Sequence, residues 1–173
     1  VLKSTNGGSS FTQIYGSTIP ATAATGQSDI AITGGKIIIA GNGGNADPTL
    51  RGVFVSNTGN TGSFTRIAGG SVLGTDSVAS WRGNAFDGSS KRIVIAAAPS
   101  NSNALYVLYE NGLSNTTPDI KPEVDLFKLD LSNNTWINRS TTMPDFPGGS
   151  NGGTDPITVQ GGYDITVAVN PDD

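Results

Sequence analysis

The chain has 173 residues, a net charge of −4, only 14% charged residues and 24 glycines. It has no Cys and no His, which excludes disulfides, Cys-based or His-based zinc sites, a Cys nucleophile and a His general base within these residues. The ten Lys and Arg form no basic stripe, so nucleic-acid binding is not expected. No apolar run reaches the roughly 20 residues of a membrane-spanning helix.

The expected elements are short strands. Helical periodicity is almost absent, and the apolar segments are β-branched or aromatic runs flanked by Gly, Asn, Ser, Asp or Pro, which is the pattern of strands joined by turns. In chain order these segments are 37–40, 53–55, 93–96, 105–109 and 165–169. The low charge argues against a disordered chain. The sequence therefore predicts an all-β fold with very little helix.

One unit recurs along the chain as a strand, a polar turn, an aromatic residue and a second strand. It is found at 2–14, again at 53–67 with one extra turn residue, and in a degenerate form at 126–137. A second unit, an apolar strand followed by Pro and a polar turn, is found at 92–101 and 164–173. Pro99 and Pro171 are 72 positions apart, as are Phe64 and Trp136. Two unlike markers with one offset indicate a structural repeat.

These residues resemble the Asp-box, or BNR, repeat of β-propellers, whose pattern is Ser-x-Asp-x-Gly-x-Thr-Trp/Phe. The matching positions are Ser4, Asn6, Gly8, Ser10 and Phe11 in the first box, Ser56, Gly62, Ser63 and Phe64 in the second, and Thr135 and Trp136 in the third. The Asn6 oxygen can accept the backbone N–H groups that a tight turn leaves unpaired. Gly8 allows a positive φ, and Phe11 is expected to pack the turn against neighbouring strands.

The resemblance implies blades, each a four-stranded antiparallel sheet. We expect a half blade at 1–16, a blade at 17–70, a blade with an inserted loop at 71–142, a loop at 143–162 and the first strand of a further blade at 163–173. Propellers usually close with about four to eight blades. The chain is therefore expected to be a segment of a larger propeller, completed by further blades of a parent chain or by other copies.

The candidate catalytic groups are carboxylates, because glycoside hydrolysis needs two of them roughly 5–10 Å apart. Propellers with these boxes occur in sialidases and xyloglucan-degrading enzymes, where the boxes are structural. The acidic residues in or near the variable segments are Glu110, Glu123, Asp125, Asp130, Asp145, Asp155 and Asp164. Surface turns explain all of them, so no pair is assigned and the chain is not expected to be an enzyme. The five Arg show no sialidase-like arrangement.

Aromatic and oxygen-rich positions are the candidates for binding. Trp81 beside Arg82 is the aromatic most plausibly exposed for stacking on a sugar ring, whereas Trp136 and Tyr106 are expected in the core with their strands. Tyr109 and Tyr163 are further aromatics of this kind. The segment 42–47 offers oxygen ligands for calcium, but a plain Gly/Asn turn explains it, and no metal or cofactor is predicted. Three glycosylation sequons begin at Asn115, Asn133 and Asn138.

Composition favours an exported protein, because a Ser/Thr/Asn/Gly-rich and Lys-poor chain is common among bacterial secreted and surface proteins. We therefore predict an extracellular or cell-surface β-propeller segment that acts as a binding or structural module, with polysaccharide as the candidate ligand. Two alternatives remain open. One is part of a xyloglucanase-like glycoside hydrolase, and the other is an assembly or sorting factor. Fold alone does not separate the three.

Overall fold

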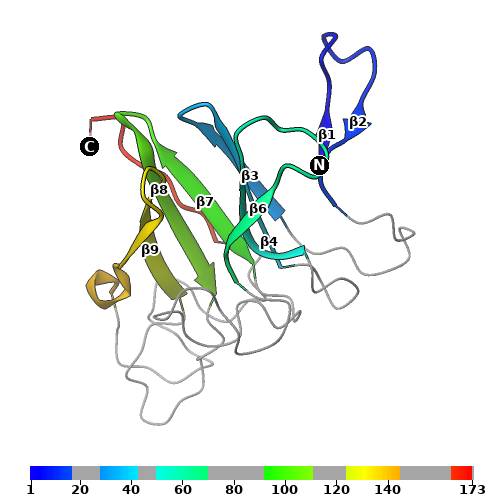
Figure 1. The fold of residues 1–173 in the computed structure, drawn as a ribbon. Helices are drawn as coiled ribbons and strands as arrows, with labels where there is room; N and C mark the ends of the chain where they lie inside the picture. The colour runs from blue at the N-terminus through cyan, green and yellow to red at the C-terminus, as the bar shows by residue number, and fades with distance from the viewer. Residues whose placement is uncertain (17–27, 43–49, 70–91, 111–123, 145–164, 173) are drawn as a thin grey trace.

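The computed structural model describes residues 1–16, 28–42, 50–69, 92–110, 124–144 and 165–172 (Figure 1). In these residues the protein is all-β, with ten strands in three antiparallel sheets and one short 3-10 turn at Ser140–Thr142. The prediction of an all-β fold is confirmed. No helix in the described part of the chain has the length and apolar character needed to cross a membrane.

The first sheet is a hairpin of two short strands, β1 (Leu2–Lys3) and β2 (Thr12–Gln13). The polar turn at residues 4–11 joins them. Figure 1 shows this hairpin at the edge of the molecule, next to the N-terminus.

The second sheet is a four-stranded meander of β3 (Ser28–Thr33), β4 (Lys36–Asn42), β5 (Arg51–Ser56) and β6 (Thr65–Ala68), paired in that order. The β3–β4 connection is the two-residue turn Gly34–Gly35, with φ of 56° and 72°. Two positive φ values are what a type I′ hairpin turn requires, and glycine adopts them without strain.

The third sheet repeats this arrangement with β7 (Ile93–Ala98), β8 (Asn101–Glu110), β9 (Val124–Asp130) and β10 (Thr135–Asn138). Every neighbouring pair is antiparallel. β7 and β10 are therefore its edge strands, as β3 and β6 are the edges of the second sheet.

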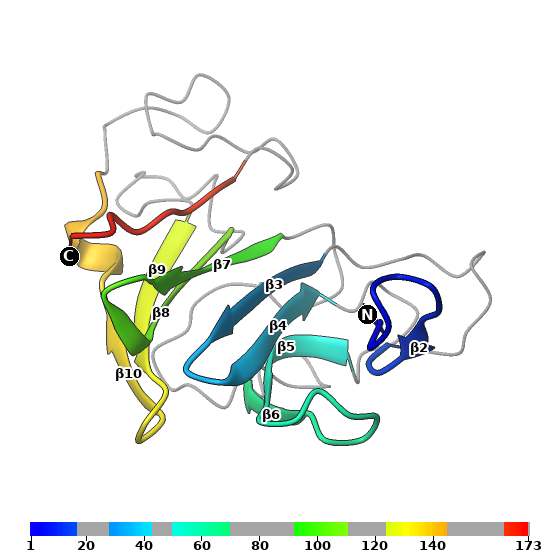
Figure 2. The same cartoon turned by 90° about the horizontal axis from the view of Figure 1, so that it is seen from above.

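The main core lies between the two four-stranded sheets, which pack face to face. One buried cluster takes Ile38, Ala40, Val53 and Ala68 from the second sheet, and from the third sheet it takes Ile93, Ile95, Leu105, Val107, Tyr109, Phe127 and Leu129. β3 and β4 lie against β7, and Figure 2 shows β3 and β7 next to each other between the two sheets. Alternation along each strand directs one set of side chains into this interface.

A smaller core covers the opposite face of the third sheet. Val94, Leu108 and Val124 pack there with Ile165, and Val167 and Met143 lie against this cluster. Residues 165–169 were expected to form a strand, but the structure assigns them to no sheet. The expectation is corrected because a strand needs a neighbour for its backbone hydrogen bonds, and this segment is held by its side chains instead.

Candidate functional site

The three polar turns predicted from the sequence lie at equivalent places. They connect β1 to β2, β5 to β6, and β9 to β10, which in the two larger sheets are the third and fourth strands. The register of the first hairpin, Leu2 with Gln13 and Lys3 with Thr12, matches that of Phe54 with Arg66 and Val55 with Thr65.

Side-chain oxygens hold the first turn. The hydroxyl of Ser4 accepts the backbone N–H of Gly8 at 2.8 Å and that of Asn6 at 3.4 Å. The Asn6 Oδ1 accepts the N–H of Ser10 at 2.9 Å, and Asn6 Nδ2 donates to Ser10 Oγ at 2.9 Å. Gly8 has a φ of 88°. The acceptor role predicted for Asn6 and the positive φ predicted for Gly8 are confirmed.

The second turn uses serine in the same way. Ser56 Oγ accepts the N–H of Gly59 at 2.8 Å and of Thr58 at 3.1 Å. Ser63 Oγ accepts the N–H of Asn60 at 3.1 Å and donates its proton to the Asn60 carbonyl at 2.6 Å. The 2.6 Å contact between the two serine hydroxyls therefore has Ser56 as donor. Ser56 is buried, and these bonds satisfy its hydroxyl without water.

The third turn depends on Asp130, whose position in it the sequence pattern missed. Asp130 Oδ1 accepts the Ser132 N–H at 2.8 Å and the Ser132 hydroxyl at 2.6 Å. These bonds, the hydroxyl first, hold the pKa of Asp130 below its ordinary value. Asn133 Oδ1 accepts the N–H of Thr135 at 2.9 Å, and Asn134 has a φ of 57°. An Asp two residues before a Ser-Asn-Asn run is a signal for an Asx turn, and this signal would have predicted the role of Asp130.

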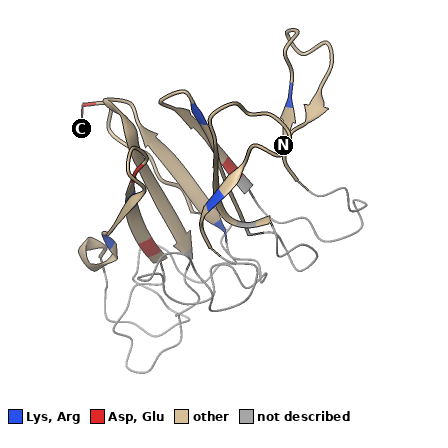
Figure 3. Cartoon of the chain, in the orientation of Figure 1, with Lys and Arg blue, Asp and Glu red and all other residues tan. Residues whose placement is uncertain are grey.

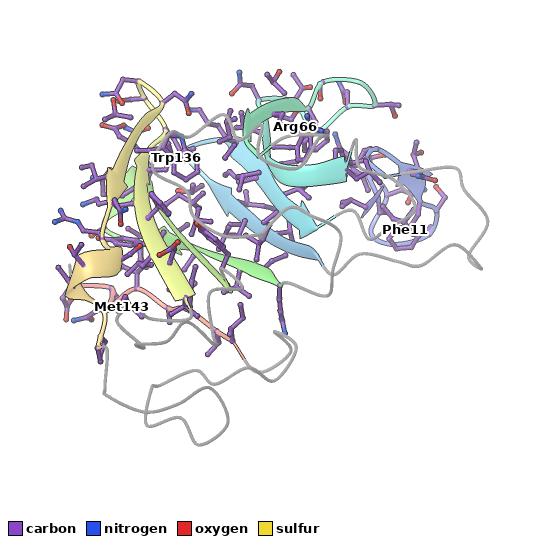
Figure 4. The ribbon with its side chains drawn as sticks, turned by 90° about the horizontal axis from the view of Figure 1, so that it is seen from below. Phe11, Arg66, Trp136 and Met143 are labelled. Carbon is purple, nitrogen blue, oxygen red and sulfur yellow. The ribbon has the colours of Figure 1, made fainter. Side chains whose placement is uncertain are left out.

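The three turn aromatics are not equally buried. Phe64 contacts Tyr15, with ring centroids 5.2 Å apart, and Trp136 meets Phe127 edge-on at 6.2 Å. Phe11 is 60% exposed, so the expectation that it packs against neighbouring strands is wrong. Phe11 lies on the hairpin face opposite Lys3, as Phe64 lies opposite Val55, but Phe64 is packed against Tyr15 and Phe11 has no such neighbour among the described residues. Figure 4 shows that Phe11 and Trp136 lie in separate parts of the molecule.

Adjacent turns contact each other. The Lys3 ammonium donates to the carbonyls of Thr58 at 3.2 Å and Gly59 at 3.3 Å, and to Asn60 Oδ1 at 3.4 Å. The hydroxyl of Thr61 returns a bond to the Gln13 carbonyl at 3.1 Å. The turns thus join successive sheets and act as structural elements.

Three of the described carboxylates, those of Asp29, Asp125 and Asp130, have structural partners. Asp125 is buried in the third sheet and accepts the hydroxyl of buried Tyr109 at 2.8 Å. Asp29 accepts the N–H of Ile30 at 2.8 Å through Oδ1, and that of Ile95 on β7 at 2.9 Å through Oδ2. Figure 3 shows acidic and basic residues dispersed over the drawn chain. In the described ranges no three Asp, Glu, His or Cys side chains gather as a metal site.

The remaining candidates divide between the core and the rest of the chain. Tyr109 is buried and therefore not available for sugar stacking, which corrects that candidate, and Trp136 packs against the core as predicted. The half-buried ring of Tyr106 lies 5.6 Å from the Lys128 ammonium. The other candidates lie outside the described residues: Trp81, Arg82, Tyr163, Asn115, Glu123, Asp145, Asp155, Asp164 and most of 42–47, as does the side chain of Glu110.

Comparison with known proteins adds no further constraint. No family model, no curated protein and no solved structure matches the chain. The functional argument therefore depends on the residues and on the geometry above.

Proposed function

We propose that this chain is a β-propeller segment that acts as an extracellular or cell-surface binding module, with polysaccharide as its ligand. The observation that carries the proposal is the repetition of one arrangement. Two four-stranded meanders stack face to face with their first strands side by side, and each has a polar turn between its third and fourth strands. Blades radiating from a common axis have this relation to one another.

The N-terminal hairpin supports the same interpretation. Its register and turn chemistry repeat those of β5–β6, and the sequence Ser10-Phe11-Thr12 corresponds to Ser63-Phe64-Thr65. The hairpin therefore corresponds to the last two strands of another blade. Its Asn6 stands where the Asp-box pattern has Asp, and the amide oxygen makes the turn bond without a charge.

The described residues supply the scaffold in this proposal, and the segments between strands supply the binding surface. The hydrogen bonds of Asp29, Asp125 and Asp130 are all to groups of the scaffold. We assign sugar binding to Trp81 and Arg82. An indole face suits the apolar C–H patches of a pyranose, and a guanidinium donates hydrogen bonds to its hydroxyls. The sequence around these two residues predicts a loop, and binding residues concentrate on loops carried by a rigid scaffold.

A glycan array and affinity electrophoresis in soluble polysaccharides test the proposal. We expect the chain to be retarded by at least one polysaccharide and W81A to lose that retardation. F11A is the matched control, because Phe11 is an exposed aromatic on a scaffold hairpin, and it should bind like the parent chain. Loss of binding in F11A but not in W81A, or no binding on any glycan, would reject the assignment. Release of reducing sugar from a bound polysaccharide would favour the hydrolase alternative instead.

A further inference from the structure

An apolar strand face is exposed on the second sheet. Ile30 and Ile32 of β3 are 49% and 72% exposed, and they pair in register with Ile39 and Ile37 of β4. Ile30, Ile32 and Ile37 are called the isoleucine face below. Isoleucines at alternate positions of one strand point to the same side of the sheet, so Ile30 and Ile32 form a continuous apolar strip. We therefore consider this strip as a candidate interaction surface.

The corresponding face of the third sheet is covered. Counted back from the hairpin turns, Ile95 and Ala97 of β7 occupy the places in the third sheet that Ile30 and Ile32 occupy in the second, yet Ile95 is only 6% exposed and Ala97 packs against the core. They are buried by the β3–β4 hairpin, which contributes Ala31, Ile38 and Ala40 to their cluster. The same face is thus buried along β7 of the third sheet and open along β3 of the second sheet, where its neighbours Ile39 and Phe54 are buried. What buries it is a β-hairpin with small and branched apolar side chains.

Part of that cover is already present on the isoleucine side of the second sheet. Tyr15, which follows β2, lies against Phe54 with ring centroids 5.0 Å apart, and also against Phe64. The N-terminal hairpin therefore covers the β5–β6 end of this sheet face but leaves β3 uncovered. In the described residues β1 pairs only with β2, whereas its counterparts β5 and β9 each pair with a further strand on their other side. In the described residues β1 thus has an open edge, and β3 has an open apolar face.

We propose that this edge and the isoleucine face together bind a β-hairpin from a further repeat of the same kind. The hairpin pairs with the backbone of β1 and lays its apolar side over Ile30 and Ile32, as β4 pairs with β5 and β3–β4 covers β7. Strand addition of this kind draws affinity from the backbone and specificity from side chains at alternate positions. The inference rests on the repeat architecture of the proposed function and adds the partner.

A second copy of the chain fits the surface less well. The β3–β4 hairpin of any copy is already paired with its own β5 and packed on its own β7. It cannot cover another molecule without first leaving that place. The occupant is therefore a hairpin whose second strand is still free to pair with β1.

The test uses the whole chain and a synthetic peptide with the sequence of residues 28–42, the one hairpin shown to cover such a face. Hydrogen exchange by NMR is measured with the peptide in trans, and again with the peptide tethered to the N-terminus by a Gly/Ser linker. The tether raises the effective concentration to about the millimolar range. We expect slower exchange of the backbone amides of Leu2, which points to the open edge of β1, and of Ile30 and Ile32, on β3. A peptide of the same composition in scrambled order should give none.

Two substitutions distinguish peptide binding at the isoleucine face from nonspecific peptide binding. I32K should weaken peptide binding at least about tenfold, because a charged ammonium would be buried under the hairpin. I137K is the matched control, since Ile137 is a strand residue 42% exposed on β10, and it should bind the peptide like the parent chain. Both positions are exposed, so neither change is expected to unfold the chain.

Each outcome decides the proposal. Unchanged exchange in both the trans and tethered arms overturns it, as does equal weakening by I32K and I137K. Sedimentation that shows dimers of the chain alone, abolished by I32K, assigns the surface to a second copy and also overturns it. Failure of sugar binding with intact hairpin binding would reject only the proposed module function. Loss of hairpin-peptide binding with intact sugar binding would reject only this inference.

Discussion

At the scale of single residues, the same task is done by different side chains in the three turns. Each turn leaves backbone N–H groups pointing inward, and an oxygen from Ser4 and Asn6, from Ser56, or from Asp130 accepts them. Small polar side chains compete well for nearby backbone groups, which is why they are favoured in turns. Each turn therefore requires an acceptor oxygen, but several residue types can supply it.

Asn6 gives the first prediction. N6A should lower the free energy of unfolding by about 1 kcal/mol, because the Ser10 N–H loses its protein acceptor. N6D should cost less, since a carboxylate oxygen still accepts that bond. Urea denaturation followed by circular dichroism measures both. Equal losses in the two variants would show that the acceptor oxygen is not what stabilises the turn.

Asp130 gives the second, a pH effect. The Ser132 hydroxyl and N–H favour the charged carboxylate, so the pKa of Asp130 is lower in the folded chain than in the unfolded chain. Its contribution to stability is complete above the unfolded pKa and is lost as the pH falls through the folded value. S132A should raise the pKa of Asp130 toward its ordinary value in a carboxyl-carbon NMR titration. S9A, on the first turn, should leave it unchanged.

At the scale of elements, the β3–β4 turn is fixed both by its own conformation and by its neighbour. Gly34 has a φ of 56°, and a Cβ on it would lie 2.8 Å from the carbonyl oxygen of Ser102, in the β7–β8 hairpin. The Thr33 hydroxyl donates to the same oxygen at 3.0 Å. The turn is therefore one of the points where the two larger sheets meet.

The third prediction compares the two glycines of that turn. G35A should cost roughly 1 kcal/mol of stability, because its φ of 72° is strained for alanine although no atom lies within 4 Å. G34A should cost more, since it adds the collision with Ser102. Thermal unfolding of both variants provides the measurement. A G34A loss no larger than that of G35A would indicate that the sheets separate freely at this point.

The sequence predicted some strands well and missed others for identifiable reasons. β4, β5, β7 and β8 contain apolar runs, which short buried strands require. β3 was missed because Asp29 and Ala31 face the third sheet while Ile30 and Ile32 face outward, so no continuous run exists. A strand was predicted at 165–169 from a similar run, but strand formation also needs a pairing partner, which a single segment cannot reveal.

At the scale of the whole molecule, one core joins two sheets. Leu105 and Phe127 of the third sheet share a buried cluster with Ile38 and Val53 of the second. Neither sheet can expose its side of this cluster without exposing the other, so the two should unfold together.

The fourth prediction follows from that shared core. L105A should lower the free energy of unfolding by about 2–5 kcal/mol, the usual cost of truncating a buried leucine. The transition should remain single when followed by both circular dichroism and tryptophan fluorescence. L2A, at an exposed position, should change stability by less than about 0.5 kcal/mol. Two separated transitions in the parent chain would show that each sheet is stable alone.

The candidate site was predictable only in its scaffold. The turn acceptors Ser4, Asn6 and Ser56 follow from local sequence, because their bonds span only a few residues. The bond from buried Tyr109 to Asp125 depends on strand register, which the sequence did not define. The binding assignment of Trp81 and Arg82 still depends on residue type alone.

The Asp29 carboxylate has a consequence for solubility. Its bond to the Ile95 N–H occupies an edge of β7 that would otherwise be a template for strands of other molecules. We therefore expect D29V to aggregate more readily than the parent chain in concentrated solution, because β7 would lose this cover.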